Sequence, residues 1–455
     1  MSTEPAQARC PAMRSFFAAR RSFVAGTSTP RAFLEDCIAS IEAQEPDVRA
    51  FVATNFEGAR AAADAATRRW QGGETLSPVD GMPLCVKDIM ETADMPTEQG
   101  SPLFVGWKGA RDCAAVAALR EAGAAIVGKT VTTEFAATVA RGTRNPWDPA
   151  RTPGGSSSGS AAGVAAGMVT AALGSQVIGS IIRPASYCGV FGYKPSVGGI
   201  NRGGSFDGFS QSCTGVLAAT LADIWAVTRA ITASVGGDAG HPGVRGPMTL
   251  PDAKKPARLA MLKTTGWDVA AEEAKAALAG ACDALRAAGI EIVDARSHDG
   301  VAAAETAIED ATPLSRRINA WEGHWPLNTY ARDMDRDGLS GEMRDRLAIA
   351  ESMTQSEYRD LTGRRDESRK TYGKLSGDID ACVTLSAPGA APVGIGSTGN
   401  PIFTVPTSFL GIPTVTLPVL RAEGLPLGLQ VIGFADRDAE LFAAAGAILS
   451  ICGRG

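Results

Sequence analysis

The chain has 455 residues, 45% of them hydrophobic, and a formal net charge of −5. This hydrophobic content is enough for a large buried core, whereas the acidic balance gives no general attraction for nucleic acid or anionic lipid. Apolar runs such as 161–173 are interrupted by glycine and are shorter than the roughly 20 residues that a membrane span requires. We therefore expect a protein that binds neither nucleic acid nor membrane.

The first 24 residues carry four scattered arginines and no apolar signal core, so we expect no export and a cytoplasmic location. The nine cysteines are widely spaced and never form a C-x-x-C pair, which favours reduced thiols. None of the three histidines has a spacing typical of a shared metal site. We expect no metal and no cofactor.

Two N-terminal stretches, Thr29–Gln44 and Asn55–Trp70, have apolar positions at helical spacing and predict two amphipathic helices. They belong to a predicted N-terminal helical segment, 1–80, that packs on the following core. From about Gly81 to Thr220, short apolar runs alternate with helix-like stretches and glycine-rich turns. This alternation predicts an α/β fold. The clearest of these runs are the strand-like Pro83–Val86, the helix-like Cys113–Ala122 and the strand-like Ala124–Val127.

The stretch Ser160–Leu173 consists almost entirely of small or apolar residues. A helix that is apolar on all sides must be buried, so this stretch predicts a core helix. The hydroxyls of the preceding run, Ser156–Ser158, are suited to the N-terminal end of that helix, where main-chain N–H groups lack partners.

The second half begins with a glycine- and proline-rich connection, Val235–Pro256, and then returns to alternating strands and helices. The region 302–373 is helical in pattern and rich in charge, which fits either a solvated layer or a layer that covers the substrate. We expect residues 81–455 to form the core, and the whole chain to form a single structural domain. The predicted elements are strands at Leu259–Leu262, Glu291–Ala295, Ala381–Leu385, Pro413–Leu417 and Gly428–Ile432, and a helix at Ala271–Ala288.

Two motif matches lack the structural context that their chemistry requires. Gly155–Gly159 fits G-x-S-x-G and would make Ser157 a nucleophile, but the prolines upstream of it cannot form the required central strand. Gly394–Gly399 fits G-x-G-x-x-G, yet Asn400 and Pro401 follow it instead of a helix. We interpret the second match as a loop.

A third set of residues combines complementary chemistry from three segments. Lys87 follows an apolar run, and a desolvated lysine has a lowered pKa and can act as a base. Ser156 lies in a glycine-flanked serine run, and Ser180 lies in the segment Gly174–Ala185. Each residue alone is more typical of a structural role. By chemistry alone, Lys129 and Lys194 are competing bases, and motif position selects Lys87.

Together these segments resemble the amidase signature family, whose members carry G-x-P-x-x-x-K, then G-G-S-S-S/G-G, then G-S/T-x-x-x-G-S. All three patterns occur here in that order, between about Gly81 and Leu217, and the resemblance resumes between Asn400 and Gln430. It implies a central mixed β-sheet covered by helices on both faces. It also implies an amidase that works without metal or cofactor.

The resemblance assigns roles to individual residues. Ser180 is the nucleophile, Ser156 the bridging serine and Lys87 the base of a Ser-cis-Ser-Lys triad. An acyl-enzyme forms on Ser180 and is hydrolysed by water. The resemblance also makes Ser157 a candidate substrate-binding residue. The expected oxyanion hole consists of the main-chain N–H groups of Val177, Ile178, Gly179 and Ser180.

The chain departs from the family pattern in three places. Val177 and Ile178 replace the usual Thr-Gly, and a β-branched residue at Ile178 must keep an ordinary backbone conformation or accept strain. Ser212-Cys213 stands where many relatives have an aspartate. Arg183 is shifted by one position, as in the malonamidase-like branch, where this arginine contacts the substrate carboxylate. A structural ion pair is the alternative role for Arg183.

We therefore predict an amidohydrolase that cleaves the C–N bond of a small amide, including one that bears a carboxylate, and releases ammonia or an amine. Two alternatives stay open. One is a glutaminase-type subunit of an amidotransferase, which needs a partner chain; the other is a non-hydrolytic binding protein on the same scaffold. The expected partner is the small-molecule amide, and a homodimer is compatible with the sequence.

Overall fold

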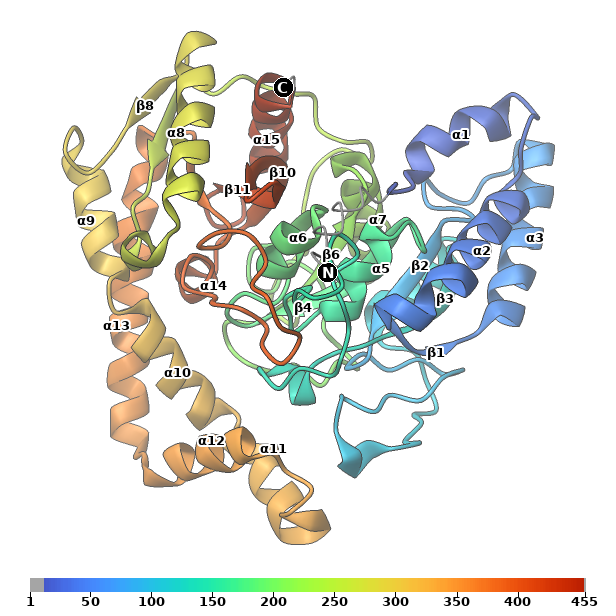
Figure 1. Ribbon diagram of the computed structural model, residues 1–455, viewed down its shortest axis with the longest axis horizontal. Helices are drawn as coiled ribbons and strands as arrows, with labels where there is room; N and C mark the ends of the chain where they lie inside the picture. The colour runs from blue at the N-terminus through green and yellow to red at the C-terminus, as the bar shows by residue number, and fades with distance from the viewer. Residues whose placement is uncertain (1–11, 454–455) are drawn as a thin grey trace, which may run out of the picture.

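The computed structural model describes residues 12–453, which are organised around one mixed sheet of eleven strands (Figure 1). The strand order is β1-β3-β2-β4-β6-β5-β10-β11-β9-β7-β8. The strands are β1 (Phe51–Thr54), β2 (Pro83–Lys87), β3 (Ala125–Thr130), β4 (Ala171–Gln176), β5 (Phe191–Lys194), β6 (Cys213–Ala218), β7 (Arg258–Met261), β8 (Glu291–Val293), β9 (Ala381–Leu385), β10 (Thr414–Ala422) and β11 (Leu425–Ile432).

Parallel and antiparallel pairs occupy different parts of the sheet. Strand β2 lies between β3 and β4 and is parallel to both, and β7 is parallel to β8 and β9. The central pairs β4/β6, β6/β5, β5/β10 and β10/β11 are antiparallel. Every residue of β2, β3 and β4 is buried, as expected for parallel strands with helices on both faces.

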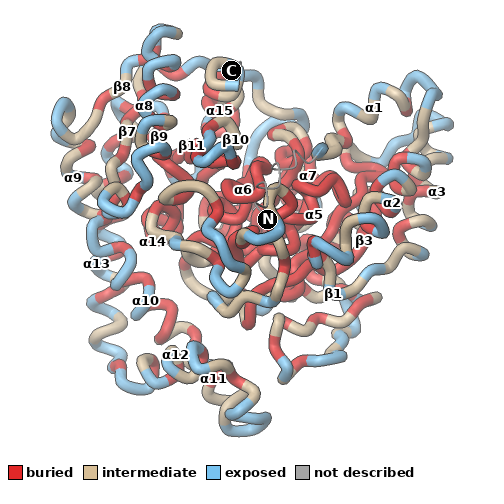
Figure 2. Tube along the Cα trace, in the orientation of Figure 1, coloured by how far each residue is buried: buried red, intermediate tan, exposed pale blue. Residues whose placement is uncertain are grey.

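Helices cover both faces, which agrees with the architecture expected from the sequence. Side chains alternate along β2: Leu84 and Val86 pack with α4 and α7 on one face, whereas Cys85 packs with α2 and α5 on the other. Buried residues accordingly fill the middle of the molecule (Figure 2). The helices beside the sheet are α1 (Phe16–Val24), α2 (Pro30–Val48), α3 (Phe56–Gly72), α4 (Ala114–Glu121), α5 (Ser158–Ala165), α6 (Ile182–Cys188), α7 (Leu221–Val235), α8 (Glu272–Ala287), α14 (Val405–Leu410) and α15 (Asp438–Cys452).

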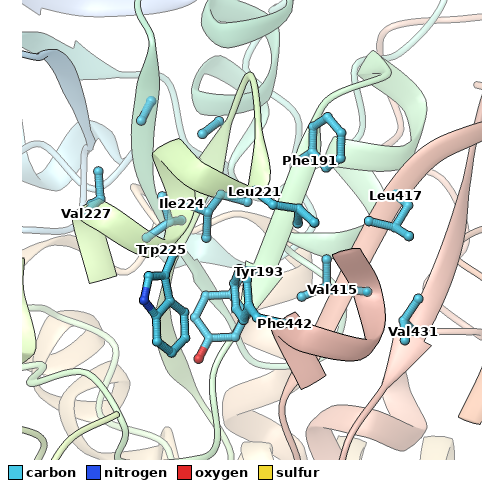
Figure 3. Close-up of a cluster of buried hydrophobic side chains, with 14 of the residues drawn as sticks. Phe191, Tyr193, Leu221, Ile224, Trp225, Val227, Val415, Leu417, Val431 and Phe442 are labelled. Atoms are coloured by element: carbon cyan, nitrogen blue, oxygen red, sulfur yellow. The ribbon is translucent and has the colours of Figure 1, made fainter. Parts of the chain in front are cut away.

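One part of the core joins the antiparallel strands to two long helices (Figure 3). Trp225 of α7 and Tyr193 of β5 both pack against Phe442 of α15, with ring centroids 4.8 Å apart in each pair. Val415 and Val431 extend this cluster along β10 and β11. Burying aromatic rings of this size removes a large apolar area from water and fixes the helices on the sheet.

The predicted core helix at Ser160–Leu173 is wrong in its second half. Helix α5 ends at Ala165, Gly167 turns the chain with a φ of +66°, and β4 begins at Ala171. A Cβ atom at Gly167 would lie 2.4 Å from the carbonyl oxygen of Ala12, so the turn requires glycine. A buried helix and a buried strand are equally apolar, and composition alone did not separate them.

The region 302–373 is helical, as expected, and extends away from the sheet along one side and the lower end of the molecule in Figure 1. Its helices pack on one another, and α9, α10 and α13 share a buried cluster with α14 and with residues of β7 and β9. The elements are α9 (Asp299–Ile308), α10 (Ala311–Glu322), α11 (His324–Thr329), a π-helix (Tyr330–Asp335), α12 (Gly341–Ser352) and α13 (Gln355–Gly373).

The remaining predicted elements agree with the structure to within a few residues. Thr29 and Asn55 cap α2 and α3 through their side chains, which fixes where the two N-terminal helices begin. The N-terminal segment also contains β1, which the sequence analysis missed and which joins the sheet edge beside β3. Short 3₁₀-helices occur at Pro102–Phe104, Glu134–Ala136, Thr265–Val269 and Lys374–Gly377.

Two expectations concern the chain as a whole. No helix within residues 12–453 has both the length and the apolar character needed to cross a membrane. The eight cysteines in this part of the chain are free thiols, and Cys10 lies outside the described residues.

Candidate active site

Lys87 is the last residue of β2, and its ammonium group is enclosed by two serines. Its Nζ atom donates to Ser156 Oγ at 2.7 Å and to Ser175 Oγ at 2.8 Å. The side chain has no exposed surface, and burial lowers the pKa of Lys87 to about 7, while the charge of Asp207 acts in the opposite direction. A substantial fraction of Lys87 is therefore neutral near pH 7 and able to accept a proton.

Ser156 lies in the tight turn that precedes α5, and the peptide bond between Gly155 and Ser156 is cis. Its neighbour Ser157 donates its main-chain N–H to the carbonyl oxygen of Ser180 at 3.3 Å. The segment of the proposed bridging serine is thus hydrogen-bonded to the segment of the proposed nucleophile.

Ser180 lies between the end of β4 and the start of α6, and it is 4% exposed. None of the four main-chain N–H groups from Val177 to Ser180 donates a hydrogen bond to another group within residues 12–453. Buried or half-buried N–H groups without a partner are rare in folded proteins. Four in succession next to a serine are suited to binding a developing negative charge.

Gln176 fixes the start of this segment through its side chain. Its Oε1 atom accepts from the main-chain N–H groups of Ile181 at 2.9 Å and Ile182 at 3.0 Å. Its Nε2 atom donates to Ser408 Oγ at 3.0 Å. The glutamine therefore closes the turn that leads into α6 and fixes the position of Ser180.

Ile178 has an ordinary backbone conformation, since its φ is not positive. Of the two possibilities that the sequence left for this residue, the unstrained one is correct. Its side chain is half-buried, packs against the cluster formed by α10, α13 and α14, and lines the cavity beside Ser180.

A cavity of about 340 Å³ opens beside Ser180. This volume lies in the range of small-molecule sites. One wall comes from the core and the opposite wall from α10 and α12, so the helical region at 302–373 contributes directly to the site. The lining residues are Phe135–Thr138, Val177, Ile178, Ser180, Arg183, Phe209, Thr312, Ser315, Arg316, Asn319, Ala320, Glu342, Asp345, Arg346, Ile349, Pro401 and Val405.

Arg183 lines this cavity but is engaged mainly with the main chain. Its Nη2 atom donates to the carbonyl oxygen of Gly155 at 2.6 Å and to Thr398 Oγ1 at 3.1 Å, and Nη1 donates to the carbonyl oxygen of Gly399 at 3.0 Å. Burial lowers the pKa of Arg183 to about 10, so it stays charged at neutral pH. No carboxylate among the described residues is paired with it, and a structural ion pair is therefore the wrong account.

Arg346, on α12, faces the cavity with fewer contacts. Its Nη2 atom donates to the carbonyl oxygen of Asn319 at 2.7 Å, and its guanidinium lies 4.6 Å from the ring centroid of Phe209. Burial lowers the pKa of Arg346 to about 10, and no described carboxylate forms an ion pair with it. This arginine therefore retains donors that a ligand can use.

Ser157 is fully buried and is not among the residues that line the cavity. Its Oγ atom donates to the carbonyl oxygen of Ser175 and accepts from the N–H of the same residue, both at 3.3 Å. These contacts support β4. Ser157 therefore does not face the cavity. It also does not occupy the position of an α/β-hydrolase nucleophile, because no strand leads into this turn.

The two competing lysines have other partners. Lys129 forms a buried ion pair with Asp88 at 2.9 Å and donates to Thr97 Oγ1. Lys194 donates to the carbonyl oxygen of Pro195 at 2.8 Å. Neither contacts Ser156 or Ser180 among the described residues, whereas Lys87 contacts Ser156.

Within residues 12–453, no three His, Cys, Asp or Glu side chains are grouped in a way that could hold a metal ion. The sequence analysis did miss Ser175, although the residue lies inside the nucleophile motif. It also missed Arg346 of α12 and Asn319 of α10, which lie outside any motif.

The site contains a lysine that is partly neutral near pH 7, a serine that is hydrogen-bonded to it, and a second serine beside unpartnered N–H groups. Serine hydrolases use this combination of a base and an activated serine. The sequence model of the amidase family matches residues 32–442. The chain belongs to this family, the amidase signature enzymes, and is an amide-hydrolysing enzyme.

Similar sequences include two glutamyl-tRNA(Gln) amidotransferase A subunits. That of Chloroflexus aggregans is 30% identical over 465 residues, which cover 93% of each chain. That of Anaeromyxobacter sp. (strain K) is 34% identical over 461 residues, which cover 91% of each chain.

Solved structures have the same fold over almost the whole chain. One belongs to a vestigial protein complex reported to reveal the evolutionary origins of an s-triazine catabolic enzyme; it is 28% identical with a TM-score of 0.84 and covers 96% of this chain and 98% of that one. A crystal structure of an amidase is 28% identical with a TM-score of 0.82, covering 96% and 99%. The peptide amidase of Stenotrophomonas maltophilia, 24% identical with a TM-score of 0.78 and 96% coverage of both chains, shares the fold.

Proposed function

We propose that the enzyme hydrolyses a small amide through an acyl-enzyme on Ser180, with Ser156 as the bridging serine and Lys87 as the base. The observation that carries this proposal is the 2.7 Å contact between Lys87 Nζ and Ser156 Oγ in a fully buried site. Neutral Lys87 takes the proton of Ser156 while Ser156 takes that of Ser180, and Ser180 Oγ attacks the amide carbonyl carbon.

Collapse of the tetrahedral intermediate breaks the C–N bond, and the proton returns through Ser156 to the leaving nitrogen. Water then attacks the acyl-enzyme by the same relay and releases the acid. The unpartnered N–H groups between Val177 and Ser180 support a role in stabilising the oxyanion in both steps. Each such donor contributes about 2.7–4 kcal/mol to transition-state stabilisation.

For the substrate, we propose an amide that also bears a carboxylate. Two guanidinium groups line the cavity together with Glu342 and Asp345, and neither guanidinium forms an ion pair with a carboxylate of the described residues. Arg346 has the donors available for a bidentate contact with a carboxylate, whereas Arg183 is engaged with Gly155 and Gly399. Between the two, Arg346 is the better candidate for direct contact, and Arg183 shapes the turn at Ser156.

The glutaminase function is the second candidate, because the relatives of about 30% identity are glutamyl-tRNA(Gln) amidotransferase A subunits matched over nearly their full length. Glutamine is itself a small amide that carries a carboxylate. Glutamine hydrolysis that appears only when a partner chain co-purifies would favour this function. Hydrolysis of other acidic amides by the isolated chain would favour the small-amide hydrolase proposed above.

The test combines covalent labelling with an amide panel. The purified enzyme is treated with a fluorophosphonate, and the modified peptide is identified by mass spectrometry. Labelling at Ser180 is expected, and Ser180→Ala should abolish it and lower amide hydrolysis by about 10³-fold or more. Ser158→Ala is the matched control, because Ser158 Oγ donates only to the carbonyl oxygen of Val131. Full activity in Ser180→Ala would refute the assignment.

A further inference from the structure

The loop 202–212 contacts both the strand that carries the base and the segment that carries the nucleophile. The N–H of Phe206 donates to the carbonyl oxygen of Ile89 at 2.9 Å, and the N–H of Glu91 donates to that of Gly204 at 3.0 Å. Both contacts lie within four residues of Lys87. At its other end, Gln211 Nε2 donates to the carbonyl oxygen of Val177 at 3.1 Å. The loop therefore lies against both halves of the reaction centre.

Asp207 lies in the middle of this loop and is 2% exposed. Neither of its carboxylate oxygens has a hydrogen-bond partner among the described residues. Burying a carboxylate without hydrogen bonds costs several kcal/mol, so its presence calls for an explanation. The charged and titratable groups that face it are Lys87 of β2, Arg202 of the same loop, Cys213 of β6 and Arg346 of α12.

Of these groups, Arg202 has another charge partner, and Arg346 lies against an aromatic ring. Arg202 is paired with Asp238 at 2.6 Å, and the guanidinium of Arg346 stacks on Phe209. Lys87 has no other anionic neighbour among the described residues, since Asp88 is paired with Lys129. Asp207 is therefore the one carboxylate among the described residues whose charge acts on Lys87, although it also acts on Arg346.

We propose that Asp207 is a positioning residue that supplies the counter-charge for Lys87 when Lys87 accepts the proton of Ser156. This inference rests on the proposed function. In the step, Ser180 gives its proton to Ser156, Ser156 gives its own to Lys87 Nζ, and the amine becomes an ammonium ion. Asp207 takes no part in this transfer and forms no bond. Its charge stabilises the ammonium in a site where burial opposes it.

The neighbouring residue Ser212 fits this role. The Ser212 hydroxyl donates to the carbonyl oxygen of Asp207 at 3.1 Å. Arg202 Nη1 donates to the same carbonyl oxygen at 3.2 Å. These contacts hold the loop so that position 207 brings a carboxylate into this region.

The experiment compares Asp207→Asn with the matched control Asp238→Asn in the full-length protein. Asp238 pairs with Arg202 on the same loop but does not act on Lys87. For each protein, amide hydrolysis and the rate of fluorophosphonate labelling at Ser180 are measured against pH. Loss of the charge that acts on Lys87 moves the midpoint of the acidic limb in the plot of rate against pH. A structural defect instead lowers the rate at every pH.

Asp207→Asn is expected to move the midpoint to lower pH by about one unit and to lower the plateau rate about three- to tenfold. Asp207→Glu and Asp238→Asn are expected to keep the wild-type midpoint. If Asp207→Asn does not fold, Asp207→Ser provides the same comparison with a smaller side chain. If Asp207→Asn keeps the wild-type midpoint, the counter-charge role is overturned. If Ser180 is not labelled in the wild type, the proposed function itself is overturned.

Discussion

Ser175 holds Lys87 in place from the strand that leads into the nucleophile segment: its Oγ atom lies 2.8 Å from Lys87 Nζ, and its carbonyl oxygen lies 3.4 Å from the same atom. Strands β2 and β4 are parallel neighbours, with Val86 beside Leu173. The base and its support therefore belong to one rigid part of the sheet. Groups placed on strands keep their geometry better than groups placed on loops.

This contact predicts the effect of Ser175→Ala. The variant should hydrolyse amides about tenfold more slowly, because a hydrogen bond to a charged or partly charged group contributes about 1.5–3 kcal/mol and part of this is specific to the transition state. Steady-state kinetics measures the change in kcat. Ser160→Ala is the matched control, since Ser160 is equally buried but bonds to Thr130 Oγ1 and to the carbonyl oxygen of Leu173. Equal losses in both variants would contradict a specific role for Ser175.

The pKa of Lys87 predicts the pH dependence of the reaction. Only neutral Lys87 can take the proton of Ser156, and burial lowers its pKa to about 7, so the neutral fraction grows as pH rises through that value. Activity should rise with pH through about 7 and then level off. Lys87→Ala should lower kcat by about 10²–10⁴-fold and remove this limb. A limb that survives in Lys87→Ala would assign the titration to another group.

Arg183 and Arg346 should respond differently to substitution. Arg183→Met removes the contacts to Gly155 and Gly399, so it should lower the free energy of unfolding by about 2–4 kcal/mol and slow acidic and neutral amides alike. Arg346→Met removes one hydrogen bond, to Asn319, so it should lower the free energy of unfolding less, by about 1 kcal/mol. It should raise KM for acidic amides about tenfold or more, with little effect on neutral ones. Urea unfolding measures the stability of each variant, and steady-state kinetics on a matched acidic and neutral amide, such as succinamic acid and butyramide, measures its effect on the substrate. Together the two measurements distinguish the role of Arg183 from that of Arg346. The reverse pattern would assign the carboxylate to Arg183.

Ile178 predicts a change in acyl-group selectivity. Its side chain lines the cavity beside Ser180, and its backbone conformation tolerates alanine without strain. Ile178→Ala should raise kcat/KM for amides with a branched or aromatic acyl group relative to that for acetamide. Since one methylene in an apolar pocket is worth about 1–3 kcal/mol, a change of about tenfold is expected. An unchanged ratio would place the acyl group elsewhere in the cavity.

Much of the site was predictable from the sequence because three motifs carry their chemistry in short, continuous segments. Lys87, Ser156 and Ser180 each lie in such a segment, and the structure brings Lys87 and Ser156 into contact. Arg346 has no such signal. It reaches the cavity through the packing of α12 on α10, a relation between distant parts of the chain that no local pattern encodes.

The fold was predictable where the hydrophobic pattern differs between helix and strand. The amphipathic helices α2 and α3 have polar caps and polar faces, so their limits were found to within a few residues. Helix α5 and strand β4 are buried on all sides, and both are rich in alanine and glycine. The turn at Gly167 is required by a close approach to Ala12, which only the folded chain reveals.

The division of the cavity between the sheet core and helices α10 and α12 has a consequence for diversification. The bond-breaking residues are carried by segments that pack on the sheet, while Ser315, Asn319 and Arg346 are carried by helices outside it. Substitutions on those helices can therefore change which molecule is admitted without disturbing the proton relay. Selection experiments that randomise only α10 and α12 offer a direct route to new amide specificities in this scaffold.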